Sequence, residues 1–335
     1  MELLRLVLMF FIVIHHSIVH GLGLMELSHS FCTLSEPAFI FACLINAFCI
    51  IAVNAFILIS GYFSIQCSKS KFIYLMAQLA VCVLLFSIPY FAATGAFRQV
   101  LSNLLLFSHS RYWFIIDYFI LFAFAPALNL LFDNTSKNGQ LLFIASLFFV
   151  SCYLGFVWHH DANINGYTIF QFIFLYSIGR FIKINDFSFK SAPATLIYVL
   201  CSVLVASLMI AFHHTGHDLR AWSMTFYNNP VLVVSAISFF FIFRNLQFQS
   251  SRINYLASSS IIIYLFTCSA LVEGIYYPLV QRQFMSVGLG VFPIILFEAL
   301  LLASTSILLD KLIVSRLVSL LHRNLMSIDF SQVKQ

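Results

Sequence analysis

Apolar residues dominate this chain in long runs that short polar stretches separate. Each run is close to the roughly 17–25 residues that a helix needs to cross a lipid bilayer. Continuous apolar runs with few charges predict membrane-spanning helices, because a soluble helix carries only one apolar face. We therefore expect an all-α, polytopic helical membrane protein with about ten transmembrane helices. The expected spans are 4–22, 38–60, 74–94, 113–132, 140–158, 168–183, 193–212, 230–245, 258–278 and 290–310.

The composition excludes a soluble protein. Of the 335 residues, 61% are hydrophobic and only 9% are charged, whereas soluble domains carry about 25% charged residues. We expect one transmembrane domain over 1–312, followed by a basic cytoplasmic tail over 313–335 whose amphipathic start suits a helix on the inner leaflet. No cleavage site follows the first run, so we expect that run to be retained.

The basic residues predict the orientation in the membrane. If the N-terminus is cytoplasmic, all Lys and Arg fall in inner segments except Arg98, Arg111, Arg220 and Arg282. This positive-inside bias predicts that both termini are cytoplasmic. The net charge of +5 thus reflects topology, and no basic patch interleaved with aromatic residues predicts binding to nucleic acid.

Cysteines and histidines give little support for a metal site. The chain has 8 Cys but no Cys-x-x-Cys pair, so neither a disulfide framework nor a zinc site is indicated. Histidines gather in two outer loops, at His213, His214 and His217 and at His159–Asp161. Zinc requires three or four converging ligands, and the sequence does not bring these loops together. We therefore expect no metal.

The first apolar run carries a polar stripe. Arg5 and His16 lie within about 20° of each other on a helix surface and about 16 Å apart along its axis. An ionisable group inside a span costs about 2.5–3.5 kcal/mol, although Arg5 can extend to the nearby interface. His15 and His16 lie too deep for that. We interpret His16 as a general base for a hydroxyl nucleophile, with His20 one turn further at the outer mouth.

Several motifs occur in one order along the chain and together resemble the acyltransferase-3 family of integral membrane O-acyltransferases. The resemblance extends over about residues 3–310. Its motifs are Arg5 with His16, Ser60-Gly61-Tyr62 at the end of the second run, Trp113-Phe114 with Pro126 and Asn129, Tyr176–Arg180, and Ser259–Leu265.

The resemblance implies an activity. Such a protein transfers an acyl group, usually acetyl from cytoplasmic acetyl-CoA, to a hydroxyl of a surface polysaccharide or its lipid-linked precursor. It implies that His16 is the catalytic histidine, that Arg5 is the family's arginine and a second catalytic residue, and that the protein lies in the bacterial inner membrane. Acetyl-CoA would be a cosubstrate, with no bound cofactor.

On the donor side, we expect Arg5, Lys69, Lys71, Ser60 and Tyr62 to bind the acetyl-CoA. Many family members carry an arginine-rich motif after the second span, where this chain has Lys69 and Lys71. Lysine binds phosphate as a point charge but cannot form the bidentate fork of arginine. The alternative is that both lysines only flank the membrane, as the positive-inside bias predicts.

On the acceptor side, we expect His20, Asn54, Trp113 and Glu273 to bind substrate, and Asp117 to orient an imidazole or bind a sugar hydroxyl. Each has a simpler alternative. Asn54 and Ser60 suit hydrogen bonds between helices, Trp113 suits an interfacial aromatic belt, and Asp117 and Glu273 lie near enough to an interface to be solvated.

A second function class stays open. A transporter or flippase for a lipid-linked sugar would use His16, Asp117 and Glu298 as a proton relay, since ionisable groups inside spans mark such pathways. Transporters of that kind often show internal repeats, and we find none in the sequence. Turnover of acetyl-CoA distinguishes the two classes, because only an acyltransferase would consume it.

Overall fold

The computed structural model describes residues 1–24, 34–95 and 112–327, and these ranges are helical without any strand. The predicted outer residues Arg98 and Arg111 and the end of the tail lie outside the described residues. The elements are α1 (Glu2–His16), η1 (Ser17–Gly21), α2 (Glu36–Cys49), α3 (Ala52–Phe63), α4 (Lys69–Thr94), α6 (Trp113–Asn134), α7 (Lys137–Phe148), η4 (Phe149–Val157), η5 (Asp161–Gly166), α8 (Ile169–Ile184), α9 (Ser191–His214), α10 (Asp218–Ser223), α11 (Pro230–Arg244), α12 (Ser251–Ala257), α13 (Ser260–Thr267), α14 (Ala270–Val287), η6 (Gly288–Gly290), α15 (Val291–Leu309), η7 (Asp310–Val314) and α16 (Ser315–Ser327).

The expected all-α polytopic fold is confirmed, but the count of ten spans is not. Within the described ranges, 7 helical stretches are long and apolar enough to cross a membrane. The sixth and eighth expected spans correspond to α8 and α11, which have only 16 and 15 residues. The ninth is broken between α13 and α14, where the Ser269 side chain caps α14 by accepting a hydrogen bond from the Val272 amide.

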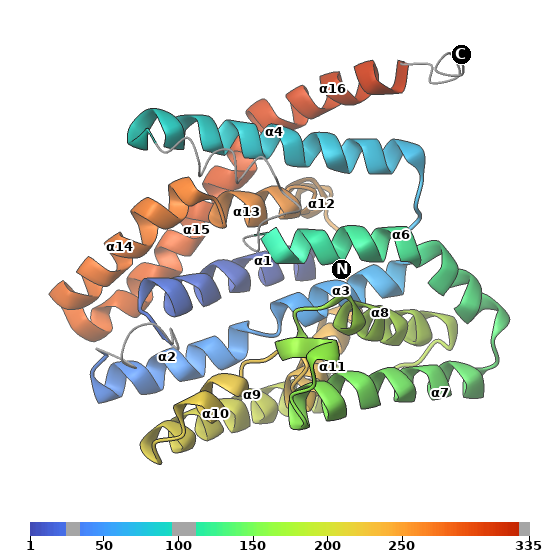
Figure 1. The fold of residues 1–335 in the computed structure, drawn as a ribbon, viewed down its shortest axis with the longest axis horizontal. Coiled ribbons are helices and arrows are strands. Elements are labelled where there is room, and N and C mark those ends of the chain that lie inside the picture. The colour runs from blue at the N-terminus through green and yellow to red at the C-terminus, as the bar shows by residue number, and fades with distance from the viewer. Residues whose placement is uncertain (25–33, 96–111, 328–335) are drawn as a thin grey trace.

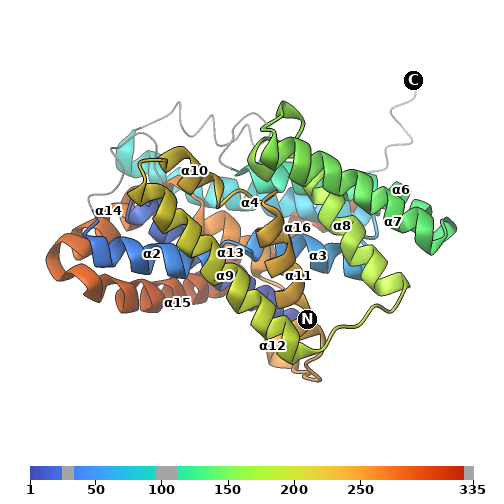
Figure 2. The same ribbon diagram turned by 90° about the horizontal axis from the view of Figure 1, so that it is seen from below.

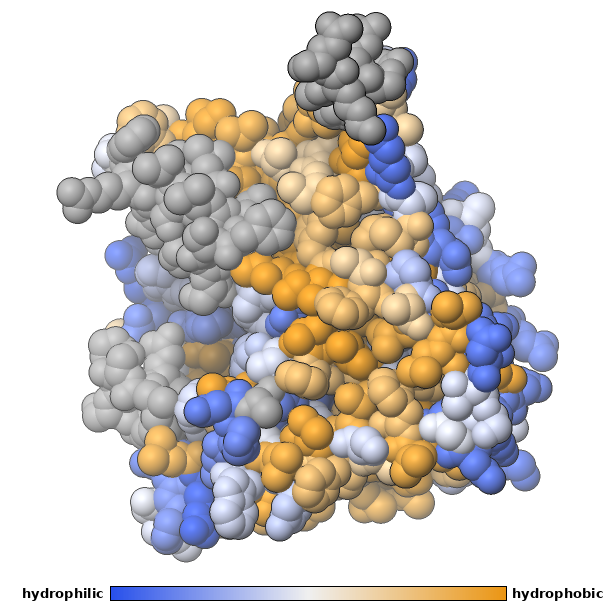
Figure 3. Space-filling view, turned by 45° about the vertical axis from the view of Figure 1, so that its right-hand side comes forward, coloured by the Kyte–Doolittle hydropathy of each residue, from blue (hydrophilic) through white to orange (hydrophobic). Residues whose placement is uncertain are grey.

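The molecular surface fits a bilayer. Figure 3 shows apolar side chains over the middle of one face, with hydrophilic side chains gathered toward opposite edges. Large apolar residues such as Leu142 on α7 and Phe297 on α15 are 70% and 62% exposed. Exposed apolar patches of this extent are rare in soluble monomers, and lipid is the environment that suits them.

Helix α1 runs through the interior of the bundle, against α2, α3, α12, α13 and α15 (Figure 1). Leu4 and Leu8 are fully buried. At Ser17 the helix widens into the π-turn η1, in which the Leu22 amide donates to the Ser17 carbonyl. The Ser17 hydroxyl donates to the Val13 carbonyl (2.7 Å) and contacts the Tyr276 hydroxyl (2.9 Å). Widened turns of this kind are frequent at functional sites.

Two glycines allow α3 and α8 to pack backbone against backbone. A Cβ atom on Gly61 would lie 2.8 Å from the carbonyl carbon of Tyr176, and one on Gly179 would lie 2.8 Å from the Tyr62 amide nitrogen. Both distances are far shorter than a normal contact, so each position accepts only glycine.

The remaining helices enclose this centre. Helix α9 packs against α11 and α2 (Figure 2), which covers one side of the bundle. Helix α16 packs against α4, which it crosses at an angle (Figure 1), and its Val318 is fully buried. The start of the predicted tail is therefore docked on the bundle.

Candidate active site

A cavity of about 390 Å³ opens at the C-terminal end of α1. We call it the outer cavity, because the predicted orientation puts this end of α1 outside. Its walls come from α1 with η1, α2, α6, α10, α13, α14 and four of the segments that connect helices. The lining residues are His15, His16, Val19, His20, Asn46, Ile50, Trp113, Tyr167, Trp222, Thr225, Tyr227, Tyr264, Cys268, Glu273 and Tyr277.

Three imidazoles form a row along one wall of the outer cavity. The ring centroids of His15 and His16 lie 5.6 Å apart, as do those of His16 and His20. The His20 ring is 5.3 Å from that of Tyr277. His15 Nδ1 contacts Asn46 Oδ1 at 2.6 Å, whereas His16 Nδ1 has the Cys268 sulfur at 3.7 Å. Neutral imidazoles in such a row can accept protons from bound hydroxyl groups.

Aromatic rings form another wall. The Trp113 ring lies 4.4 Å from that of Tyr167 and is stacked at 5.6 Å on that of Tyr227, and the two tyrosine rings are 5.0 Å apart. Aromatic faces beside a few polar groups are typical of ligand pockets that hold a partly apolar, partly hydroxylated molecule.

Buried amides hold the aromatic wall in place. The Tyr227 carbonyl accepts hydrogen bonds from Asn54 Nδ2 (2.9 Å) and Gln171 Nε2 (2.8 Å). Asn54 is fully buried, and Gln171 is 1% exposed. The Ser151 hydroxyl contacts Gln171 and accepts a bond from Asn163 Nδ2 at 2.7 Å. Asn54 therefore supports the cavity from behind.

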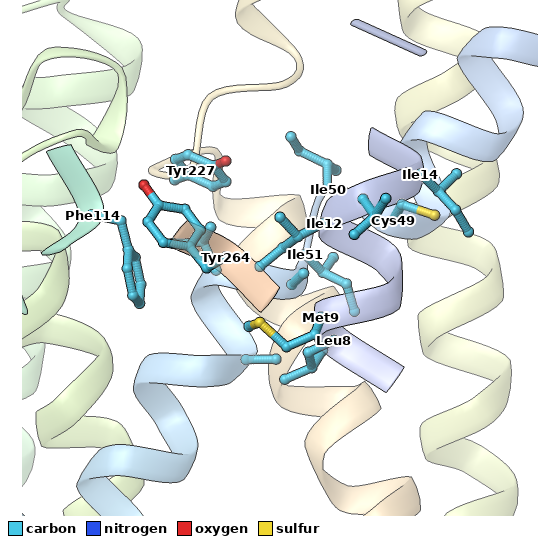
Figure 4. Packing of buried hydrophobic residues seen from close by; sticks show 14 of the residues in the cluster. Leu8, Met9, Ile12, Ile14, Cys49, Ile50, Ile51, Phe114, Tyr227 and Tyr264 are labelled. Carbon is cyan, nitrogen blue, oxygen red and sulfur yellow. The ribbon is translucent and has the colours of Figure 1, made fainter. Parts of the chain in front are cut away.

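A narrow space of about 30 Å³ continues from the outer cavity into the bundle. We call it the crevice. His15, His16, Trp113, Tyr227 and Tyr264 line both spaces. Its other walls are apolar, and Figure 4 shows Met9 and Ile12 of α1 on one side with Phe114, Tyr227 and Tyr264 on the other.

A further cavity of about 460 Å³ lies between α4, α6, α13 and α16. We call it the inner cavity. Its residues are Ser70, Lys71, Tyr74, Leu75, Gln78, Tyr118, Phe122, Ser258, Ile261, Ser315 and His322. Tyr118 connects it to predicted donor-side residues, because its hydroxyl interacts with Ser60 and lies in electrostatic range of Arg5. Arg5 near the start of α1 is thus in electrostatic range of a residue of the inner cavity, whereas His15 and His16 at the end of α1 line the outer cavity.

The structure brings four of the predicted residues together. His16, His20, Trp113 and Glu273 all line the outer cavity. Asp117 on α6 is partly buried and lines neither cavity.

The predicted donor-side residues are more dispersed. Lys71 lines the inner cavity, and Lys69 is the first residue of α4. Arg5 is paired with Glu2 at 2.8 Å, and its guanidinium carbon lies 5.9 Å from the centre of the Phe63 ring. The Tyr62 ring lies 5.2 Å from Lys183 Nζ and 5.7 Å from the Arg244 guanidinium carbon.

Several lining residues were not singled out in the sequence. Asn46, Tyr167 and Tyr227 contribute to the outer cavity, and Gln171 supports it. A buried amide within an apolar run was the only available signal for Asn46. The outer histidines form carboxylate pairs, His213 with Asp218 (2.7 Å) and His214 with Glu36 (2.9 Å). Among the described residues, no group of His, Cys, Asp and Glu is arranged to hold a metal ion.

Comparison with known proteins assigns the family. Neither curated proteins nor solved structures give a match to this chain. A family model described as an acyltransferase domain matches residues 1–309. That range contains the imidazole row, the aromatic wall and the crevice. The chain therefore belongs to the acyltransferase-3 family and is a membrane protein that transfers acyl groups.

Proposed function

We propose that this protein is a membrane O-acyltransferase that moves an acetyl group from cytoplasmic acetyl-CoA to a hydroxyl of a surface polysaccharide or its lipid-linked precursor. One observation carries the proposal. In a chain of the acyltransferase family, His16 lines the outer cavity together with His20 and Glu273, and Lys71 lines a second cavity whose Tyr118 is in electrostatic range of Arg5.

His16 is the general base in this proposal. The acceptor hydroxyl oxygen attacks the thioester carbonyl carbon while the hydroxyl proton passes to the imidazole. The carbon–sulfur bond then breaks, and the CoA thiolate leaves and takes the proton back as the free thiol. The bond that forms is the acetyl ester of the acceptor. His16 lines both the outer cavity and the crevice, where the acceptor and the acetyl group would meet.

The donor is proposed to enter from the N-terminal end of α1. CoA carries phosphate groups, and Lys71 and Arg5 supply positive charge on this side. Tyr118 and Ser60 lie between the inner cavity and Arg5. The acyl end of the donor then points along α1 toward the crevice.

The acceptor is proposed to bind in the outer cavity. A sugar ring has an apolar face of C–H groups and a rim of hydroxyls. The Trp113, Tyr167 and Tyr227 rings suit that face, and His20 and Glu273 supply polar groups for the rim.

The test is mass spectrometry of surface polysaccharide from a deletion strain complemented with wild type, His16→Ala or His217→Ala. His217 lies next to α10 and does not line the cavity, so it is the matched control. We expect acetyl esters with wild type and His217→Ala but not with His16→Ala, at equal membrane levels of protein. Esters retained with His16→Ala would refute the base assignment. Loss of the whole glycan on deletion would instead support the transport function.

A further inference from the structure

The inner cavity is partly built from chain that lies beyond the family match. The match ends at residue 309, yet Ser315 of α16 and His322 of the same helix line the cavity. Lys311 reaches its edge, because Lys311 Nζ donates to the Ser258 hydroxyl at 2.6 Å and Ser258 is a lining residue.

The Lys311 ammonium group is held at a defined place. Its side chain is 14% exposed, and its Nζ lies 4.4 Å from the centre of the Tyr255 ring, a favourable cation–π distance. Together with Lys71, it brings two ammonium groups to one cavity. Lysine is a point charge that suits phosphate oxygens.

A buried carboxylate lies directly behind Lys311. Asp310 is 2% exposed, and its two oxygens accept short hydrogen bonds from the Ser259 hydroxyl (2.6 Å) and the Ser315 hydroxyl (2.8 Å). Lys311 Nζ is further away, at 3.3 Å. The two serine hydroxyls satisfy both carboxylate oxygens, and Lys311 keeps its charge close to Asp310 while its ammonium group lies at the cavity edge beside Ser258.

Helix α16 is fastened to α4 at the same cavity. His322 Nε2 lies 3.1 Å from both the carbonyl oxygen and the hydroxyl of Ser70, and its ring meets the Tyr74 ring edge-on at 5.7 Å. Val318 is fully buried on the same side of the helix. A helix that served only to cover the membrane surface would not need these polar contacts.

We propose that residues 310–327 complete the site for the phosphate groups of the acyl donor, with Lys311 and His322 as ligands beside Lys71. This inference rests on the proposed function, since it takes the donor to be a CoA thioester. Tyr74 and Tyr118 line the same cavity and suit an adenine ring.

The test compares two donors in membranes that contain wild type, Lys311→Gln, His322→Gln or Lys137→Gln. Lys137 is exposed at the start of α7 and lines neither cavity, so it is the matched control. Acetyl-CoA carries phosphates, whereas S-acetyl-N-acetylcysteamine has the same thioester without them. We expect Lys311→Gln to raise KM about tenfold for acetyl-CoA, as loss of one charged hydrogen bond predicts, and to leave KM for the phosphate-free donor unchanged.

His322→Gln is expected to act in the same direction with a smaller effect, and Lys137→Gln to match wild type. Equal KM changes with both donors, or a Lys311→Gln variant that matches the Lys137→Gln control, would overturn the inference. The inference would also be overturned if Lys311→Gln only removed the stabilisation of the protein by phosphatidylglycerol vesicles. The cavity would then bind a lipid headgroup.

The experiments distinguish a failure of this inference from a failure of the proposed function. If wild type transfers acetyl from neither donor, the proposed function fails, and thermal unfolding with CoA alone then tests the site. The phosphate site would be supported if CoA raised the Tm of wild type but not that of Lys311→Gln. It would be refuted if CoA did not raise the Tm of wild type. Size-exclusion elution in detergent checks that each variant is folded.

Discussion

Replacing Gly61 with alanine tests the backbone packing of α3 against α8. The added Cβ atom would lie 2.8 Å from the Tyr176 carbonyl carbon and 2.9 Å from its Cα. Carbon atoms in favourable contact are about 3.5–4.0 Å apart, so the helices would have to separate by about 0.7 Å or more. The atoms that clash belong to backbone, and no side chain can rotate to make room.

The expected cost follows from this geometry. Overpacking of a well-packed interior costs about 1–3 kcal/mol, and a rigid backbone contact favours the upper part of that range. At about 2–4 °C per kcal/mol, Tm should fall by about 4–12 °C. Activity should fall as well, because Ser60 and Tyr62 flank the substituted position.

The assay is thermal unfolding of detergent-purified protein, and the chain offers a matched control. Gly274 is also inside a helix, α14, but a Cβ atom there meets nothing within 4 Å. Gly274→Ala should therefore leave Tm unchanged or raise it slightly, since alanine favours helix by up to about 1 kcal/mol. A Gly61→Ala variant as stable as Gly274→Ala would refute the packing argument.

Three further outcomes are expected. Arg5→Ala should raise KM for acetyl-CoA several-fold, because the proposed function places the donor phosphates near Arg5 and Tyr118; an unchanged KM in a donor titration would leave Arg5 as an interfacial residue. Asn54→Leu should cost about 0.5–1.5 kcal/mol of stability, because the Tyr227 carbonyl loses one bond but keeps the bond from Gln171, and should raise KM for the acceptor; wild-type values of Tm and KM would contradict this. Tyr276→Phe should cost only about 0.5–1.5 kcal/mol, because the Ser17 hydroxyl keeps its bond to Val13; a larger fall in Tm would mean that Tyr276 does more than brace η1.

Local sequence patterns predicted the helices well, because every long apolar run must satisfy its backbone hydrogen bonds within itself in a membrane. The break before α14 was missed because Ser269 caps a helix inside a largely apolar run, with Cys268 and Ala270 on either side of it. The same composition fits one long helix or two short ones. Only the packing of α13 and α14 distinguishes them.

The site was predicted in part. His16, His20, Trp113 and Glu273 were expected on the acceptor side and do line one cavity. The helical register favoured His16 alone, but His15 lines the cavity as well, where it contacts Asn46 of α2. Contacts between distant segments, such as Gln171 with Tyr227 or His322 with Ser70, leave no trace in local periodicity.

In the proposed function, the crevice limits the length of the acyl group that is transferred. Its volume is about 30 Å³, against about 390 Å³ for the outer cavity that it continues. Met9 and Ile12 are 3% and 5% exposed and cannot move aside without disturbing the packing around α1. In the proposed function the α1 wall of the crevice therefore limits the acyl group: an acetyl group requires the smallest displacement of these buried side chains, and each further methylene requires more.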